Sequence, residues 1–309
     1  PQVSRVPRTR AVVSPANQRF KNKRSVPKRA IFFWGADKMS WLRYMTLWTF
    51  RQCNPGWRMQ LYRAPQRRFE KYWTERVQQD FFRYTGPNYL DLLPDISGLE
   101  VIDWEPPPAP GMRKAGPSHL SNIFKWQQMA EEGGVYVDMD IVCVRPLTEW
   151  YKLIEKGSSL CWRSEKRYFS IGLLGSQGNS QFYQDVLRNA IKCFSAKVYQ
   201  SVGVETLYRL YRKVGKPGGP NVWQRIVRSY PEERFVNFKM HHVYPWDSTQ
   251  VAHMFQRELT VIPKATWGIH WYAGHPIAQK ANNHLDERTV WSHRSTVAHF
   301  LREMLKAHE

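Results

Sequence analysis

The chain has 309 residues, with 46 Lys and Arg against 26 Asp and Glu, and a formal net charge of +20. It contains no run of 18 apolar residues, which excludes a membrane-spanning helix in these residues, and its four cysteines form no Cys-x-x-Cys pair, so no structural zinc site is indicated. The length predicts one large α/β domain or two small ones, and the scattered cysteines favour a reducing, cytoplasmic compartment.

The positive charge is concentrated at the start of the chain. Residues 1–30 contain nine Lys or Arg and no acid. Because this segment is rich in Pro, Ser and Asn and lacks apolar periodicity, we predict a flexible basic arm over residues 1–26 and a single domain over residues 27–309. A polyanion is the natural partner, because neutralised phosphates release counterions. Solubility and contact with an anionic membrane surface are the alternatives.

The first elements of the domain alternate between strand and helix. Ala30–Trp34 predicts a strand, Met39–Gln52 an aromatic-rich helix and Met59–Tyr62 a second strand. In such a β-α-β unit, ligands bind at the carboxyl ends of the strands. We therefore expect a binding site at that edge of the sheet.

Several segments lead from there to the centre of the sequence. Phe69–Tyr84 has helical composition, Glu100–Trp104 predicts a short strand, and the proline-rich loop Pro106–Gly116 is either a mobile lid or a spacer. Pro117–Glu132 then predicts a helix, with Ser118 as its N-cap.

Two carboxylates follow this helix, one residue apart. Gly133 and Gly134 provide a left-handed end to the helix, and Val135–Val137 has the composition of a buried strand. In extended chain, residues i and i+2 point the same way, so we expect Asp138 and Asp140 to face one site. Two buried carboxylates repel each other and lose hydration unless a positive group compensates them. Since Mg²⁺ takes one or two carboxylates together with phosphates and waters, this stretch predicts a platform for a metal-bound diphosphate.

The second half of the chain continues the alternation of strands and helices. We predict strands over Leu160–Trp162 and Tyr168–Leu174, and helices over Gln181–Ser195, Val204–Lys213 and Asp286–Lys306. The last of these helices is amphipathic and is expected to pack against the domain.

The segments His119–Lys125 and Gly133–Asp140 together resemble the sugar-nucleotide glycosyltransferases with a DXD-containing sugar-binding region. This superfamily includes the yeast initiating mannosyltransferases, the α-1,4-galactosyltransferases and the glucosylating clostridial toxins. Its usual pattern is His-x-Ser-Asp-x-x-Arg, a helix, Gly-Gly, an aromatic residue and Asp-x-Asp. The chain departs from it at Asn122, which replaces the acid, and at Lys125, which replaces the arginine.

The resemblance implies roles for several residues on the donor side. The first strand and helix resemble the opening of the family, which implies that Trp34 stacks on the donor base, with Phe33 adjacent. In the family, the positions of Asn122 and Lys125 hold the hydroxyls of the donor sugar and the neighbouring phosphate. Asn can still bond hydroxyls, whereas Lys offers a point charge instead of a bidentate fork.

The resemblance also implies a metal site. The late segment Thr266–Trp271 is similar to a family motif whose His or Asn completes the metal or diphosphate site, which implies a role for His270, with Trp271 beside the phosphates. The implied ligands of Mn²⁺ or Mg²⁺ are then Asp138, Asp140 and His270, and Asp138 also contacts the donor. A third departure is Ile171, where the family usually has Asn.

The implied fold is α/β of the GT-A type, with a Rossmann-like nucleotide-binding half, a central and mostly parallel sheet, and helical additions. The implied reaction moves a sugar from a nucleoside diphosphate sugar, with a UDP-sugar favoured, to a hydroxyl acceptor. The family usually retains the anomeric configuration, and no residue of the sequence indicates a nucleophile.

The acceptor has three interpretations. The net charge and the basic arm favour DNA with a hydroxymethylated base, as in phage DNA modification in an infected bacterial cell, where the enzyme would flip the base out of the duplex. A polysaccharide or lipid-linked glycan is the second interpretation, with the arm on an anionic membrane. The third is a nucleic-acid-binding protein without catalysis, which only the departures at Asn122 and Lys125 favour.

Overall fold

The structure is a computed structural model, and it describes residues 25–64, 84–163, 168–211 and 221–308. Nearly all of the predicted basic arm and of the predicted helix Phe69–Tyr84 lies outside the described residues. Val26, which the sequence analysis assigned to the arm, is buried in the core, and its N–H donates to the carbonyl of Glu155 at 2.6 Å.

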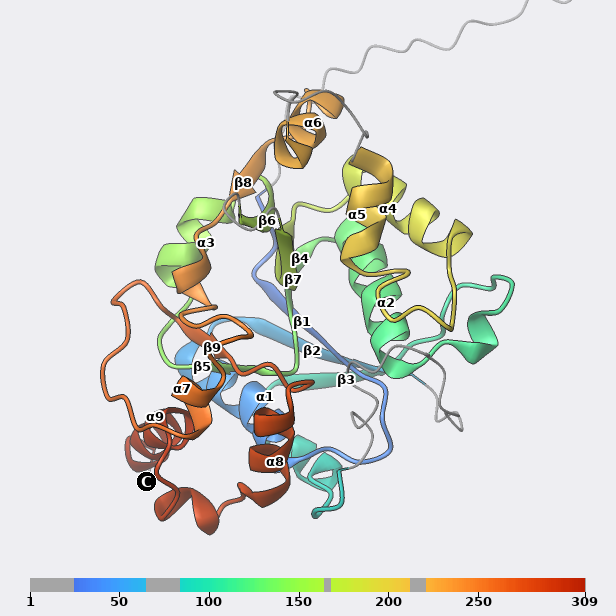
Figure 1. The fold of residues 1–309 in the computed structure, drawn as a ribbon. Helices are drawn as coiled ribbons and strands as arrows, with labels where there is room; N and C mark the ends of the chain where they lie inside the picture. The colour runs from blue at the N-terminus through green and yellow to red at the C-terminus, as the bar shows by residue number, and fades with distance from the viewer. Residues whose placement is uncertain (1–24, 65–83, 164–167, 212–220, 309) are drawn as a thin grey trace, which may run out of the picture.

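Two sheets form the framework of the described chain (Figure 1). The larger sheet has seven strands: β1 (Arg29–Trp34), β2 (Arg58–Arg63), β3 (Leu99–Asp103), β4 (Gly134–Val137), β6 (Ser158–Arg163), β7 (Tyr168–Ser176) and β8 (Phe235–Asn237). Their order is β3-β2-β1-β4-β7-β6-β8, in which β7 is antiparallel to both neighbours and every other pair is parallel. The smaller sheet pairs β5 (Ile141–Cys143) with β9 (Gly268–His270) antiparallel.

The helices of the described chain connect and cover these strands. They are α1 (Trp41–Cys53), α2 (Pro117–Glu131), α3 (Thr148–Ile154), α4 (Gln181–Lys192), α5 (Val204–Tyr211), α6 (Val222–Ser229), α7 (Ala252–Phe255), α8 (Pro276–His284) and α9 (Thr296–Lys306). Short 3-10 helices occur at Leu90–Asp95, Met112–Lys114, Met240–His242 and Thr289–Trp291. Among the described helices, none combines the length and the apolar composition that a bilayer crossing requires.

The alternation of side chains along β1 separates two core layers. Phe32 packs edge-to-face on Phe50 of α1, with the ring centroids 5.3 Å apart, on the face that α1 and α3 cover. Phe33 points to the other face and lies 5.1 Å from Phe124 of α2. Because both faces of the sheet are covered at its centre, β1 and β4 are buried almost throughout, whereas β3 at the edge is largely exposed. The parallel order β3-β2-β1-β4, with α1 and α2 as crossover helices, confirms the predicted α/β fold of the GT-A type with its Rossmann-like half.

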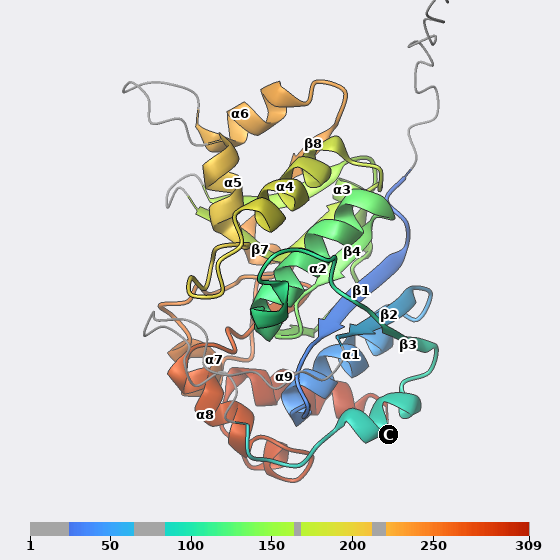
Figure 2. The same cartoon turned by 90° about the vertical axis from the view of Figure 1, so that its right-hand side faces the viewer.

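The C-terminal elements form a third layer. Helices α7, α8 and α9 lie together at one end of the molecule, next to α1 (Figure 2). Leu42 and Met45 of α1 share a buried cluster there with Trp271 and with Leu301 of α9. This layer places the end of β9 against the carboxyl edge of the larger sheet.

The structure corrects two helix ends. The predicted helix Asp286–Lys306 begins only at Thr296, because the hydroxyl of Ser295 accepts the N–H of Ala298 at 3.2 Å and caps α9 there. The N-cap of α2 is Gly116 and not Ser118, because Pro117 already occupies the first helical position, where its missing N–H costs nothing.

Gly133 ends α2 as predicted, in the left-handed conformation with φ of 75°. A side-chain carbon placed on it would lie 2.3 Å from the backbone nitrogen of Gly178 and 2.4 Å from the carbonyl oxygen of Ser176. The absent side chain therefore lets the end of α2 approach the end of β7 closely.

We predict that Gly133→Ala lowers the free energy of unfolding by about 2–4 kcal/mol, because it combines left-handed strain with a backbone clash. Urea unfolding followed by circular dichroism measures this change. Gly56→Ala is the matched control, since a carbon placed there has no atom within 4 Å, and we expect a change within about 0.5 kcal/mol. Equal effects of the two substitutions would contradict this account of Gly133.

Candidate metal and nucleotide-sugar site

Asp138 and Asp140 lie half-buried on either side of the buried Met139, in a turn where the chain passes from the larger sheet to the smaller one. The N–H of Asp138 donates to the carbonyl of Gly172 at 2.7 Å, and the carbonyl of Asp140 accepts the N–H of Trp271 at 2.9 Å. The hydroxyl of Thr46 donates to the carbonyl of Met139 at 3.1 Å. The two carboxylates thus approach one site because the chain turns at Met139, and the expectation of extended chain at this point was wrong.

One oxygen of Asp138 is occupied by protein donors. The ammonium of Lys125 lies 3.1 Å from Oδ1, and the hydroxyl of Tyr136 donates to the same atom at 2.8 Å. Since the Tyr136 proton goes to the carboxylate, its oxygen accepts from the hydroxyl of Ser121, which lies at 2.8 Å. Burial, followed by the charge of Asp138, raises the pKa of Tyr136 well above its ordinary value, so it remains a neutral donor. Oδ2 is the oxygen left to face the cavity.

Asp140 pairs with the histidine that the resemblance singles out. Nε2 of His270 lies 3.2 Å from Oδ1 of Asp140, and the N–H of Ala273 donates to Oδ2 at 2.9 Å. Burial alone would raise the pKa of Asp140, but the charges of His270 and Arg43 and the Ala273 N–H together hold it below its ordinary value. Asp140 is therefore a stable carboxylate.

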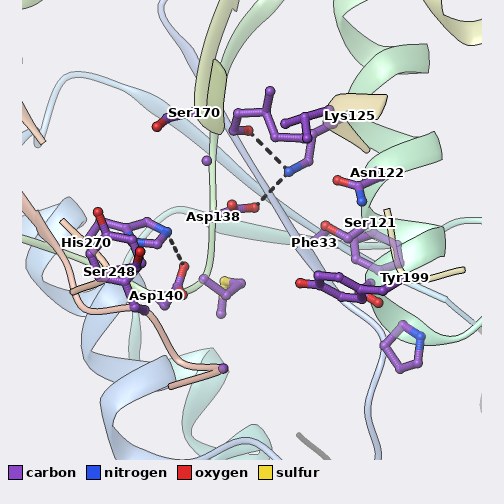
Figure 3. Close-up of a pocket in the computed structure, with 18 of the residues that line it drawn as sticks. Phe33, Ser121, Asn122, Lys125, Asp138, Asp140, Ser170, Tyr199, Ser248 and His270 are labelled. Atoms are coloured by element: carbon purple, nitrogen blue, oxygen red, sulfur yellow. Dashed lines mark hydrogen bonds and ion pairs between the residues drawn. The ribbon is translucent and has the colours of Figure 1, made fainter. Parts of the chain in front are cut away.

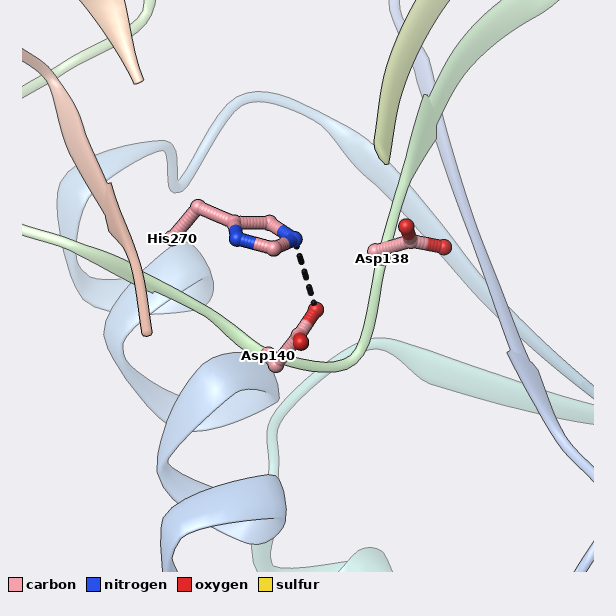
Figure 4. Close-up of side chains that lie close together, drawn as sticks. All are labelled: Asp138, Asp140 and His270. Carbon is pink, nitrogen blue, oxygen red and sulfur yellow. Dashed lines mark ion pairs between the residues drawn. The ribbon is translucent and has the colours of Figure 1, made fainter. Parts of the chain in front are cut away.

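Asp138, Asp140 and His270 converge from two segments that lie 130 residues apart in the sequence (Figure 4). One ligand atom from each of them lies within 4.8 Å of the others. Two carboxylates suit Mg²⁺ and Mn²⁺, and an imidazole adds affinity for a first-row transition metal, so this donor set fits Mn²⁺ or Mg²⁺. The structure brings together all three residues that the resemblance implied as ligands.

Arg43 is a buried cation that lines the cavity together with these acids and stabilises their charge. Its guanidinium carbon lies 5.4 Å from the ring centroid of Trp34 and 4.9 Å from that of Trp271, so the cation sits between two indole faces. Burial lowers the pKa of Arg43, although Asp140 and Asp138 act to raise it, and a guanidinium keeps its charge in such surroundings. No motif of the sequence predicted a role for Arg43. The one signal that could have done so is its position in the first turn of α1, the helix that follows β1.

A cavity of about 1040 Å³ opens at the carboxyl ends of β1 and β4 and contains the three residues of the metal site. Phe33, Trp34, Asn122 and Lys125, for which the resemblance implied donor binding, also line it, and their role stays a prediction. Figure 3 shows Asn122, Ser121 and Lys125 on the side of α2, and Asp140, His270 and Ser248 on the opposite side. This volume is at the upper end of the range for small-molecule sites and accommodates a ligand the size of a nucleotide sugar.

Trp271 does not line the cavity. Its ring is fully buried in the C-terminal cluster, where it packs on Phe255 and supports Arg43. The sequence analysis expected Trp271 beside the phosphates. The structure instead buries Trp271 away from the cavity wall, in contact with Arg43.

Further polar residues of the cavity went unnoticed in the sequence as site residues. They include Ser121, Tyr136, Arg163, Tyr199 and Tyr244. Tyr136 occupies the aromatic position of the motif, and Tyr244 lies in the segment His241–Asp247, but nothing in the sequence indicated that Tyr136 would bond Asp138 or that the ring of Tyr244 would pack beside His270. Burial raises the pKa of Tyr244 well above its ordinary value.

Residues 100–156 match the protein family described as "Glycosyltransferase sugar-binding region containing DXD motif". This range runs from β3 through α3 and includes Asn122, Lys125, Asp138 and Asp140. This segment of the chain is therefore similar to the sugar-binding region of the DXD glycosyltransferases. The resemblance inferred from the sequence is thereby confirmed for this segment. No curated protein sequence matches the chain.

Solved structures that resemble the chain include three glycosyltransferases. PaToxG glycosyltransferase aligns with 14% identity and a TM-score of 0.41, over 68% of this chain and 75% of that one. Glycosyltransferase GlyE of Streptococcus pneumoniae TIGR4 aligns with 11% identity and a TM-score of 0.41, over 90% of this chain and 60% of that one. Galactosyltransferase LgtC, in complex with donor and acceptor sugar analogues, aligns with 11% identity and a TM-score of 0.41, over 90% and 95%.

The pair Lys125–Asp138 gives a prediction that separates charge compensation from packing. Lys125→Met keeps an apolar side chain of similar length but removes the charge, so we expect the free energy of unfolding to fall by about 1–3 kcal/mol. The loss is limited because Asp138 is partly exposed and Tyr136 still donates to it. Saturating Mn²⁺ should narrow the difference in stability between the native protein and the variant, because the ion supplies positive charge at the same carboxylate. Thermal unfolding of both proteins with and without Mn²⁺ is the measurement, and a difference that Mn²⁺ leaves unchanged would contradict the shared site.

Proposed function

We propose that this protein is a metal-dependent glycosyltransferase that moves a sugar from a nucleoside diphosphate sugar to a hydroxyl acceptor. A UDP-sugar is the favoured donor, Mn²⁺ or Mg²⁺ the cofactor, and retention the expected anomeric outcome. The observation that carries the proposal is the convergence of Asp138, Asp140 and His270 in a large cavity, within and beside the segment that matches the DXD sugar-binding family.

The metal ligands in this proposal are Asp138, Asp140 and His270. When bound, the divalent ion offsets the charge that develops on the leaving diphosphate. The imidazole favours Mn²⁺ over Mg²⁺, because affinity for a nitrogen ligand is greater among the first-row transition metals. Arg43 adds a fixed positive charge on the same side of the site.

The donor is held, in this proposal, by the wall of the cavity between β1 and α2. Trp34 stacks on the base, with Phe33 adjacent to it, and the ring of Phe33 packs on Trp104 and Phe124. Asn122 and Lys125 lie one helical turn apart on α2, so their side chains reach the same region. Lys125 also donates to the carbonyl of Ile171 at 3.2 Å, which holds its charge between Asp138 and the space for the phosphates.

DNA with a hydroxymethylated base is the acceptor that we propose. The net charge of +20 and the nine basic residues among the first 30 support a polyanionic acceptor, since a nucleotide sugar alone requires far less positive charge. A base that leaves the duplex also needs a pocket with stacking surfaces. Such a reaction belongs in a reducing cytoplasm, for example that of a phage-infected bacterium.

A glycan acceptor is the second candidate, because aromatic hydroxyls line the same cavity. Tyr168, Tyr199 and Tyr272 lie on its wall together with Ser248 and Gln279. Flat aromatic faces with neighbouring hydrogen-bonding groups also suit a sugar ring, in which case the basic residues would contact an anionic membrane surface.

The metal site predicts the behaviour of Asp140→Asn. This change keeps the size of the side chain but removes one charged ligand, so we expect at least a hundredfold fall in Mn²⁺-dependent hydrolysis of UDP-sugars and a parallel loss of Mn²⁺ binding by electron paramagnetic resonance. Asp185→Asn is the control, since Asp185 lies outside the site and bonds Tyr230 at 2.7 Å. An Asp140→Asn protein that hydrolyses UDP-sugars at the native rate would refute the proposed metal site.

The acceptor is tested with hydroxymethylated duplex DNA and unmodified DNA of the same sequence, each incubated with UDP-sugars and Mn²⁺. We expect a sugar adduct on the nucleosides of the first duplex alone, detected by mass spectrometry and absent with Asp140→Asn. Hydrolysis of UDP-sugars without an adduct would favour the glycan acceptor. Tight DNA binding without transfer or hydrolysis would instead indicate a nucleic-acid-binding protein that does not catalyse.

A further inference from the structure

Gly172 lies in β7 directly opposite Asp138. The N–H of Asp138 donates to the carbonyl of Gly172 at 2.7 Å, which extends the antiparallel pairing of β4 with β7 by one residue. The carbonyl of the preceding residue, Ile171, accepts from the ammonium of Lys125 at 3.2 Å. The backbone of β7 thus fixes both Asp138 and the cation that is paired with it.

Space, and not backbone conformation, requires a glycine at position 172. Gly172 is not among the described glycines with a positive φ, so its backbone suits any residue. A β-carbon there would lie 2.8 Å from Oδ2 of Asp138, 2.9 Å from the hydroxyl oxygen of Tyr244 and 3.2 Å from Cδ2 of His270. A carbon atom overlaps with an oxygen atom at the first two distances, so both oxygen atoms would have to move.

Neither of these side chains can move alone. Lys125 and Tyr136 hold the other oxygen of Asp138, at 3.1 and 2.8 Å, so a shift of the carboxylate strains both contacts. The side chain of Tyr244 is buried and its ring packs on that of His270, with the centroids 5.1 Å apart. A shift of Tyr244 therefore pushes His270 as well.

We propose that Gly172 is a positioning residue that sets the spacing between Asp138 and His270. Asp138 comes from the end of β4 in the larger sheet and His270 from β9 in the smaller sheet, and Gly172 is the point at which the two approach each other. A side chain at this point would spread the two metal ligands apart. The inference rests on the proposed function, because it assumes that both residues bind one divalent ion.

The experiment compares Mn²⁺ binding by the native protein and by Gly172→Ala, with and without UDP. Electron paramagnetic resonance of free Mn²⁺ gives the affinity, and thermal unfolding without metal gives Tm. We expect Gly172→Ala to bind Mn²⁺ about tenfold to a hundredfold more weakly, as for other residues that orient metal ligands. We also expect Tm to fall by about 3–8 °C, because the added methyl group overpacks a buried site.

Gly175→Ala is the matched control, because it adds the same methyl group to the same strand outside the cavity. A β-carbon at Gly175 would lie 2.6 Å from Oγ of Ser159 and 2.8 Å from Cδ1 of Ile154, so the overlap is similar. This control should lower Tm by a similar amount and leave Mn²⁺ affinity unchanged. A loss of Mn²⁺ affinity in both variants would show that the strand is merely destabilised, which would overturn the role of Gly172.

The double variant Gly172→Ala/Tyr244→Phe tests the route through Tyr244. Removing the hydroxyl takes away the oxygen at 2.9 Å, so the ring of Tyr244 no longer has to push His270. We expect the double variant to have a higher Tm than Gly172→Ala and to recover part of the Mn²⁺ affinity. If Gly172→Ala does not fold, the double variant takes its place against Gly175→Ala.

Two results separate this inference from the proposed function. Mn²⁺ affinity within about twofold of the native value, in Gly172→Ala or in the double variant that replaces it, would overturn the positioning role. Failure of the native protein to bind Mn²⁺, with or without UDP, would instead overturn the proposed metal site.

Discussion

The structure depends on placing two carboxylates, one residue apart, in a half-buried turn. Asp138 and Asp140 repel each other and lose part of their hydration there, so positive charge around the turn stabilises it. Lys125 contacts Asp138, His270 contacts Asp140, and Arg43 adds a buried guanidinium on the cavity wall. The arrangement that stabilises the turn also gathers the three residues that could hold a divalent cation.

The compensating groups come from three separate layers of the fold. Arg43 is in the first turn of α1, Lys125 is on α2, and His270 ends β9 of the smaller sheet. The turn at Met139 joins these layers, because it leads the chain from β4 of the larger sheet to β5 of the smaller one. The C-terminal layer packs against α1 and in doing so also brings His270 to Asp140, so the packing of this layer and the assembly of the candidate metal site depend on each other.

Aromatic rings contact the charged groups of the site, and 14% of the residues of the chain are aromatic. Trp34 and Trp271 enclose Arg43, and the ring of Tyr136 lies 4.6 Å from the ammonium of Lys125. The rings of Tyr244 and Tyr272 pack against the ring of His270, with centroid distances of 5.1 and 4.4 Å. The contacts of Arg43 and Lys125 with aromatic faces hold these cations in place without supplying further negative charge.

Local patterns in the sequence determined the first strands, the end of α2 at Gly133 and the need for positive charge beside Asp138 and Asp140. Each of these follows from neighbours along the chain: alternating side chains, a residue without a Cβ, two acids in an apolar run. The resemblance to a known family further indicated His270. Only the tertiary structure decided that the acids lie in a turn, that Arg43 joins them and that Trp271 is buried against Arg43, away from the cavity. These depend on contacts between segments more than 90 residues apart, which no pattern of period two or 3.6 encodes.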